Sequence, residues 1–231
     1  TAYRLCEVSC PPRAIYFVHS QRMGSAPVVT YYDLLDREVR KESTGFDGTA
    51  VYVDTEYNFL GQISRVSNPY FAGDTPLWTV YQYDLVNRPV QETAPGQRIT
   101  TTSYAGRTTT VTNQLFQIST RTVDVRGRLI SSTDSQGSAV TYQYDAFGNL
   151  VEMEDSAGNV TAMTYDIRGR KLSMDDPDSS VTLYQYDTRG ELLFQIDANG
   201  NSVSMVYDAL GRLVRRAELE GIASWKYDIQ P

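Results

Sequence analysis

A five-residue motif, Tyr-Asp-x-x-Gly, recurs at a fixed spacing in the second half of the chain and constrains the fold more than any other feature. Four copies follow one another in steps of 21 residues, measured from one aspartate to the next. A fixed period of this size is typical of repeat architectures, in which each repeat packs only on its neighbours. The signature residues are Tyr144, Asp145 and Gly148; Tyr165, Asp166 and Gly169; Tyr186, Asp187 and Gly190; and Tyr207, Asp208 and Gly211.

The motif has the chemistry of a tight turn. An aspartate side chain accepts a hydrogen bond from the backbone two residues further on, and glycine adopts a positive φ without steric cost. Degenerate copies upstream carry Asp36 and Asn87 in place of the glycine. Asp and Asn are the other residues that best tolerate the left-handed conformation. We therefore predict that this position is left-handed throughout and that backbone geometry, rather than a ligand, maintains the motif.

A second, weaker turn lies halfway between successive copies, so that turn-opening aspartates alternate at spacings of 10 and 11 residues. Each 21-residue repeat is then two short strands joined by two tight turns. The residues one, three and five before each motif aspartate are aromatic or apolar, as in Tyr144, Tyr142 and Val140, whereas those between them are mostly small or polar. This two-residue alternation is typical of β-strands. We predict an all-β meander of about 18 to 22 short antiparallel strands that forms a curved or spiralling sheet.

The tyrosines on one face of this sheet have two interpretations. Packing of the rings against their neighbours is the simpler one, with a polar partner for each phenol that is buried. The alternative is an exposed aromatic ladder that binds glycans.

Composition excludes several classes of protein. The 231 residues carry a formal charge of −7, which argues against a nucleic-acid partner, and no apolar run is long enough for a membrane-spanning helix. The start of the chain does not resemble a signal peptide, and we expect the chain to be a piece of a longer protein. Its only cysteines are Cys6 and Cys10, and its only histidine is His19. We predict no metal, no cofactor and no catalytic residues; free thiols are the expected state of the two cysteines, with a local disulfide as the alternative.

The repeat pattern divides the chain. Residues 1–30 lack it and are predicted to form a β lead-in, and residues 31–231 carry the repeats, irregular over 31–123 and regular over 124–228. A loop at residues 68–76 interrupts the irregular part. Its residues Tyr70 and Phe71, with Trp78 just beyond, are the candidate contact residues for a partner. The alternative is a hairpin excursion that packs on its own aromatic side chains.

These motifs resemble the RHS or YD repeats, a family named for the Tyr-Asp pair, over nearly the whole of residues 31–228. The resemblance implies a long, spiralling β-sheet that forms part of a hollow shell. Bacterial toxins of the family enclose a toxic C-terminal segment, and the teneurins of animal cell surfaces share the repeat.

The upstream half resembles most the B component of insecticidal Tc toxin complexes. The residues that carry this likeness lie at 29–33, 45–48, 51–57 and 69–76. The resemblance implies three kinds of partner: other shell segments or a C-type subunit, an enclosed toxin domain, and a pore-forming A component. It also implies that the protein is secreted or lies at the bacterial surface. The conserved core with cleaving aspartates that usually follows the repeats is not found in these residues, so no autoproteolysis is expected.

The functional hypothesis that follows is a structural wall segment, without chemistry of its own, in a shell that encapsulates a toxic cargo. The alternative is an adhesion module of a cell surface that binds glycan or protein. An enzyme is a third and weaker hypothesis, because converging acid, base and nucleophile residues are not found in the sequence.

Overall fold

The computed structural model describes residues 2–6, 10–21 and 26–228, and these form 22 β-strands and no helix. The prediction of an all-β chain is confirmed, and the number of strands falls at the upper end of the expected range. In this described part of the chain, no helix is long and apolar enough to cross a membrane.

The chain divides into two compact units. The first consists of Thr1–Tyr104 and Thr110–Ile118, and the second of Ala105–Thr109 and Ser119–Pro231. The strands, in chain order, are β1 (Ala2–Leu5), β2 (Tyr16–Ser20), β3 (Val28–Tyr32), β4 (Glu38–Thr44), β5 (Ala50–Tyr57), β6 (Ile63–Ser67), β7 (Tyr70–Phe71), β8 (Trp78–Tyr83), β9 (Pro89–Ala94), β10 (Arg98–Ala105), β11 (Thr108–Thr112), β12 (Ile118–Val123), β13 (Leu129–Thr133), β14 (Ala139–Tyr144), β15 (Leu150–Glu154), β16 (Val160–Tyr165), β17 (Lys171–Asp176), β18 (Ser180–Tyr186), β19 (Leu192–Ile196), β20 (Ser202–Tyr207), β21 (Leu213–Glu218) and β22 (Gly221–Ser224).

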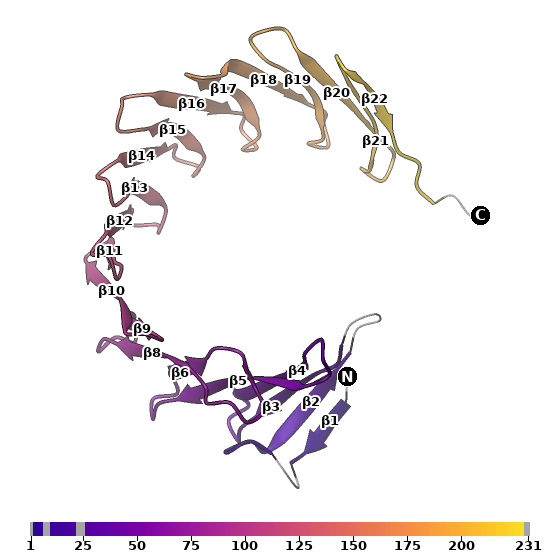
Figure 1. The fold of residues 1–231 in the computed structure, drawn as a ribbon. Helices are drawn as coiled ribbons and strands as arrows, with labels where there is room; N and C mark the ends of the chain where they lie inside the picture. Colours follow the sequence, from indigo (N-terminus) through magenta and orange to yellow (C-terminus); the bar gives the residue numbers. More distant parts are fainter. Residues whose placement is uncertain (1, 7–9, 22–25, 229–231) are drawn as a thin grey trace. The chain divides into compact units, whose positions relative to one another are not determined.

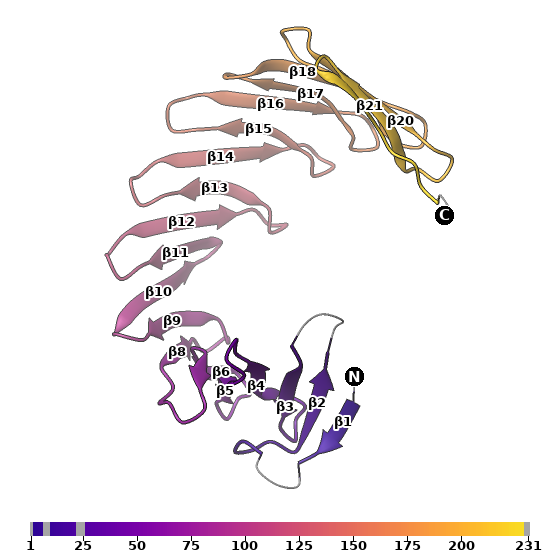
Figure 2. The same ribbon diagram turned by 45° about the vertical axis from the view of Figure 1, so that its right-hand side comes forward.

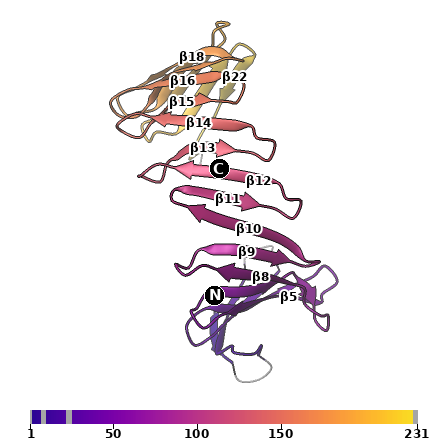
Figure 3. The ribbon, with the colours of Figure 1, turned by 90° about the vertical axis from the view of Figure 1, so that its left-hand side faces the viewer.

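In the second unit each strand from β12 to β22 pairs antiparallel with the next, so the sheet is a simple meander (Figures 2 and 3). The first unit follows the same rule except around β5 (Figure 1). The first half of β5 pairs with β7, and its second half pairs with β6, which in turn pairs with β8. The short strand β7 comes from the loop that interrupts the repeats.

A β-bulge recurs at the same place in eight strand pairs, directly before the motif turn. In each of them the motif tyrosine, or the residue in its position, lies opposite the residue six positions further on, as Tyr144 lies opposite Leu150. A bulge bends its strand and increases the local twist. The repeat therefore carries a bend as well as a turn, and this was not predicted from the sequence.

The sheet is one layer, and its side chains are therefore incompletely buried. Among the described residues, Val39 and Met163 are the only hydrophobic residues classed as buried, at 7% and 8% exposure. The two-residue alternation is present: Tyr142 and Tyr144 are half-buried, and Thr141 and Gln143 between them are exposed.

Cys6 and Cys10 form a disulfide with a Cα–Cα distance of 5.9 Å. The expectation of free thiols was wrong, and the alternative, a local disulfide, is what the structure has. The backbone N–H of Cys6 donates to the carbonyl of Ile15 (2.8 Å), which ties the bonded segment to the start of β2.

Candidate functional site

The motif aspartate is the organising residue of each turn. In the turn at Asp166, one carboxylate oxygen accepts hydrogen bonds from the backbone N–H groups of Arg168 (2.9 Å) and Arg170 (3.0 Å). The other oxygen accepts from Nε of Arg170 at 2.6 Å. The backbone N–H of Arg170, with its guanidinium, holds the pKa of Asp166 below its usual 3.8, although burial opposes the shift. The same arrangement recurs at Asp33, Asp84, Asp124 and Asp208.

The arginine four residues after the aspartate also contacts the next repeat. Its guanidinium lies over the ring of the following motif tyrosine, as Arg128 does over Tyr144 at 4.6 Å from the ring centroid. We call this the Asp–Arg–Tyr contact. Equivalent pairs are Arg37 with Tyr57, Arg88 with Tyr104, Arg170 with Tyr186 and Arg212 with Tyr227, at 4.2 to 5.1 Å.

The tyrosine hydroxyl completes the connection between repeats. Tyr144 donates to the backbone carbonyl of Leu129 at 2.9 Å, and Tyr207 donates to that of Leu192 at 3.1 Å. The acceptor is in each case the first residue of the strand that follows the preceding turn. Tyr144 and Tyr207 thus lie at joints between repeats, where they bond one repeat to the next.

The turn at Asp145 has the neutral Asn149 in place of the arginine, and the turn at Asp187 has an acid there. The residue four positions after Asp187 is Glu191, so two carboxylates meet where the other turns place an aspartate with arginine or a neutral side chain. Arg189 reaches both, at 3.5 Å from Asp187 and 3.3 Å from Glu191. Partial desolvation, and then the neighbouring Asp187, raise the pKa of Glu191.

The candidate contact residues of the interrupting loop have different environments. The Tyr70 hydroxyl donates to Asp54 at 2.6 Å and accepts from Arg40 at 2.9 Å; burial and then this bond to Asp54 raise the pKa of Tyr70 to about 12. Arg65 lies over the ring of Trp78 at 4.1 Å from its centroid. Phe71, in contrast, is 49% exposed. A contact role for the three remains a prediction.

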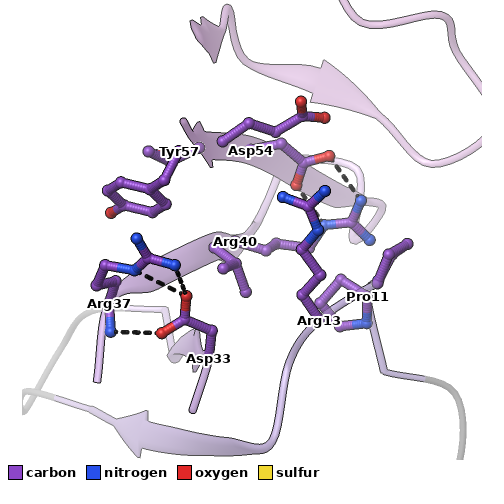
Figure 4. Close-up of a pocket in the computed structure, with 11 residues that line it drawn as sticks. Pro11, Arg13, Asp33, Arg37, Arg40, Asp54 and Tyr57 are labelled. Atoms are coloured by element: carbon purple, nitrogen blue, oxygen red, sulfur yellow. Dashed lines mark hydrogen bonds and ion pairs between the residues drawn. The ribbon is translucent and has the colours of Figure 1, made fainter. Parts of the chain in front are cut away.

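A cavity of 290 Å³ lies in the first unit, between the segment at Pro11–Arg13, the turn that opens at Asp33 and the end of β5 (Figure 4). Two ion pairs line it: Arg37 with Asp33 at 2.6 Å and Arg40 with Asp54 at 2.6 Å. Arg13 extends into the same cavity (Figure 4). Sequence reasoning missed this site because its residues come from three separate stretches of chain.

His19 lies in β2 and is exposed, and the part of the chain that the structure describes contains no group of three or more His, Cys, Asp or Glu residues placed to hold a metal ion.

The fold and the turn chemistry together define a β-sheet protein of the YD-repeat class. Residues 97–230 match the family model of the teneurin YD-shell. The match covers more than half of the chain, which therefore belongs to the teneurin YD-shell family. No curated protein sequence matches the chain.

Solved structures with the same fold come from Tc toxins. A crystal structure of TcdB2-TccC3 aligns with a TM-score of 0.69 at 18% identity, over 90% of this chain and 14% of that one. The Photorhabdus luminescens Tc holotoxin pore with a TccC3 mutation aligns with a TM-score of 0.68 at 18% identity, over 92% of this chain and 14% of that one. The predicted resemblance to Tc toxin complexes is therefore confirmed at the level of the fold. This chain spans about one seventh of those chains.

Proposed function

We propose that this chain is a wall segment of a YD-repeat shell that encloses a toxic cargo domain in a bacterial secreted toxin complex. Membership of the YD-shell family supports a structural role of the shell type. The observation that carries the proposal is the Asp–Arg–Tyr contact, because this contact recurs along the chain and joins each repeat in which it occurs to the next. On this proposal the wall acts by sequestration and performs no chemistry.

The single-layer sheet is suited to such a wall. Its less exposed face carries tyrosine and methionine side chains, such as Tyr142, Met153, Met163 and Tyr184, that no second layer of the described chain covers. An apolar surface of this kind can contact an enclosed polypeptide through non-directional packing. Its partners are then neighbouring shell segments or a C-type subunit, the cargo and a pore-forming A component. The similar solved structures, a TcdB2-TccC3 complex and a Tc holotoxin pore, support partners of this kind.

The test is protection of a cargo inside the full-length polypeptide that carries these residues. One cleavage site for a specific protease is placed in the polar turn at residues 135–137, and a second in the segment that follows the repeats. We expect rapid cleavage at the turn and resistance in the following segment until the shell is unfolded by denaturant. Equal cleavage rates at both sites in the folded protein would contradict encapsulation.

The second candidate is an adhesion module, and two exposed phenylalanines favour it. Phe46 is fully exposed in the turn beside β7, and Phe71 of β7 is 49% exposed. A Cβ atom on Gly45 would lie 3.5 Å from the Phe71 ring, so the two aromatic positions are close neighbours. If they form a binding patch, Phe46→Ser with Phe71→Ser abolishes binding to cells or to a glycan array, and Phe147→Ser in a distant turn does not. A wild-type chain that binds neither surface would remove this candidate.

A further inference from the structure

We propose that the cavity in the first unit binds a monoanionic carboxylate with a short hydrocarbon body, through the guanidinium of Arg13. This inference concerns a ligand site in the first unit and does not depend on the wall function. Its probe is a small carboxylic acid, and the natural source is a free acid of this type or an acidic side chain of a peptide.

The first argument is charge. The cavity is lined by three carboxylates, and each of them is already paired with an arginine: Asp33 with Arg37, Asp54 with Arg40, and Glu56 with Arg65. Asp54 also accepts a hydrogen bond from a tyrosine hydroxyl. The charge of Arg13 is therefore in excess.

The second argument is the state of Arg13 itself. Its guanidinium makes no hydrogen bond or ion pair with any described residue, although it points into a cavity that contains carboxylates (Figure 4). The fork of an arginine matches the two oxygens of a carboxylate and is suited to bidentate binding. Arg13 is an exposed residue, so its fork is accessible to a carboxylate that enters the cavity from solvent.

The third argument is the backbone that positions this side chain. Arg13 has a φ of +71°, in the left-handed region that non-glycine residues rarely adopt. The segment is fixed on both sides: the N–H of Ala14 donates to the carbonyl of Pro11 (3.1 Å), and the N–H of Ile15 donates to that of Tyr32 (2.7 Å). Arg13 is the third residue of the turn that this Pro11–Ala14 bond closes, a position where a left-handed conformation is common after a proline, and the turn fixes the direction in which the side chain leaves the backbone.

The size and lining of the cavity select the ligand. A volume of 290 Å³ accommodates a small group only. Among the described residues that line the cavity, Arg13 is the cation without a carboxylate partner, so its single charge matches a monoanionic carboxylate better than a phosphate dianion. Pro11, Val39 and the ring of Tyr57 supply apolar surface for a few carbon atoms.

The experiment titrates the intact chain with propionate and with the peptide acetyl-Ala-Glu-Ala-amide, and follows the side-chain Nε–H signal of Arg13 by NMR. Propionamide is the neutral control, and inorganic phosphate is the competing anion. We expect both carboxylates to shift the signal with saturation, propionamide to leave it in place, and phosphate to bind at least about tenfold more weakly than propionate. Tighter binding of propionate would identify a free acid as the natural ligand, and tighter binding of the peptide would identify an acidic side chain.

The decisive variant is Arg13→Gly, which removes the guanidinium and also relieves the left-handed strain, so that folding is not at risk. With binding followed by calorimetry, we expect its affinity for propionate to fall by about tenfold or more while its stability is equal or higher. Gln97→Gly, at another exposed left-handed position (φ +60°), is the control for the backbone change, and Arg121→Ala is the control for the charge; neither should alter binding. Absence of binding by the wild-type chain, unchanged affinity in Arg13→Gly, or tighter binding of phosphate would overturn the proposal.

Discussion

At the scale of the residue, the motif is defined by one backbone conformation. The glycine position has a positive φ in the motif turns, and Asp36 and Asn87 adopt it with φ of +63° and +67°. The prediction that these two residues are left-handed is confirmed. Phe116 adopts it as well, with φ of +58°, in a turn that the sequence analysis missed.

The turn at Phe116 could have been predicted from a pair of side chains rather than from a glycine. Asn113 opens the turn and donates from its side chain to Gln117 at 2.7 Å, as Asn58 does to Gln62 at 2.6 Å in the turn that ends β5. The pair of Asn with Gln four residues later was the available signal. A search for glycine could not find it, because the rest of this turn supplies enough hydrogen bonds to hold a phenylalanine in the left-handed region.

The Asp187–Glu191 pair gives a prediction for a single residue. Glu191→Arg should recreate the Asp–Arg–Tyr contact, with a guanidinium paired to Asp187 and placed over the ring of Tyr207. We expect a rise in Tm of about 1–3 °C, since a cation over an aromatic ring and the removal of like-charge repulsion are each modest at exposed sites. Thermal unfolding measured by circular dichroism checks this.

The control for that experiment is Glu191→Gln, which removes the repulsion without adding a cation. We expect it to produce a smaller rise than Glu191→Arg. If the two variants gained equally, the ring contact would add nothing and the arginine would act only by its charge.

At the scale of the element, the bond from a tyrosine hydroxyl to the preceding repeat should be measurable by itself. Tyr144→Phe removes the hydrogen bond to the Leu129 carbonyl and leaves the ring under Arg128. We expect a loss of about 1 kcal/mol in the free energy of unfolding, measured by urea denaturation. Tyr142→Phe is the matched control on the same face of the same strand, because the Tyr142 hydroxyl makes no hydrogen bond with a described residue. Equal losses in the two variants would mean that the bond between repeats is not what stabilises the joint.

The turns also predict how stability depends on pH. Backbone N–H groups, together with the side chain four residues on, hold the pKa values of Asp84, Asp166 and Asp208 below the usual 3.8. A carboxyl group with a lowered pKa in the folded state contributes stability above its unfolded pKa, and that stability is lost as pH falls through the folded pKa. We expect the urea midpoint to be level from about pH 5 to 8 and to fall below about pH 4.

Salt separates the two causes of this acid dependence. Hydrogen bonds from backbone N–H groups act at contact distance, whereas exposed ion pairs are screened at high ionic strength. We therefore expect the fall below about pH 4 to persist in 1 M NaCl. Its disappearance in salt would assign it to the arginine ion pairs instead.

The elements could be predicted from the sequence to the extent that they depend on local chemistry. The 21-residue period, the turns and the alternation of strand faces are all set within a few residues of chain, and each is present in the structure. The contact of each arginine with the next tyrosine ring and the bond of a tyrosine hydroxyl to the preceding strand are not local in this sense. They depend on which side chains the folded sheet brings together, as does the cavity that Arg13 enters.

At the scale of the whole molecule, the sheet ends are unprotected. Among the described strands, β1 pairs only with β2, and β22 pairs only with β21. An unpaired strand edge is a template for pairing with another chain. Such an edge can be satisfied by a neighbouring shell segment or, for the isolated chain, by another copy of itself.

We expect the isolated chain to self-associate with rising concentration, as measured by sedimentation in the analytical ultracentrifuge. Ile222→Lys places a charge on the edge strand β22, where Ile222 is 62% exposed, and should lower the degree of association. Leu183→Lys is the control, on the interior strand β18 where the side chain is 49% exposed. It removes a similar apolar surface away from the sheet edge and should not lower the degree of association. If the wild-type chain stayed monomeric at high concentration, its edges would be protected by their own geometry. Dissociation caused equally by both variants would instead locate the contact on the face of the sheet, and the wall would then associate through its side chains rather than through its backbone.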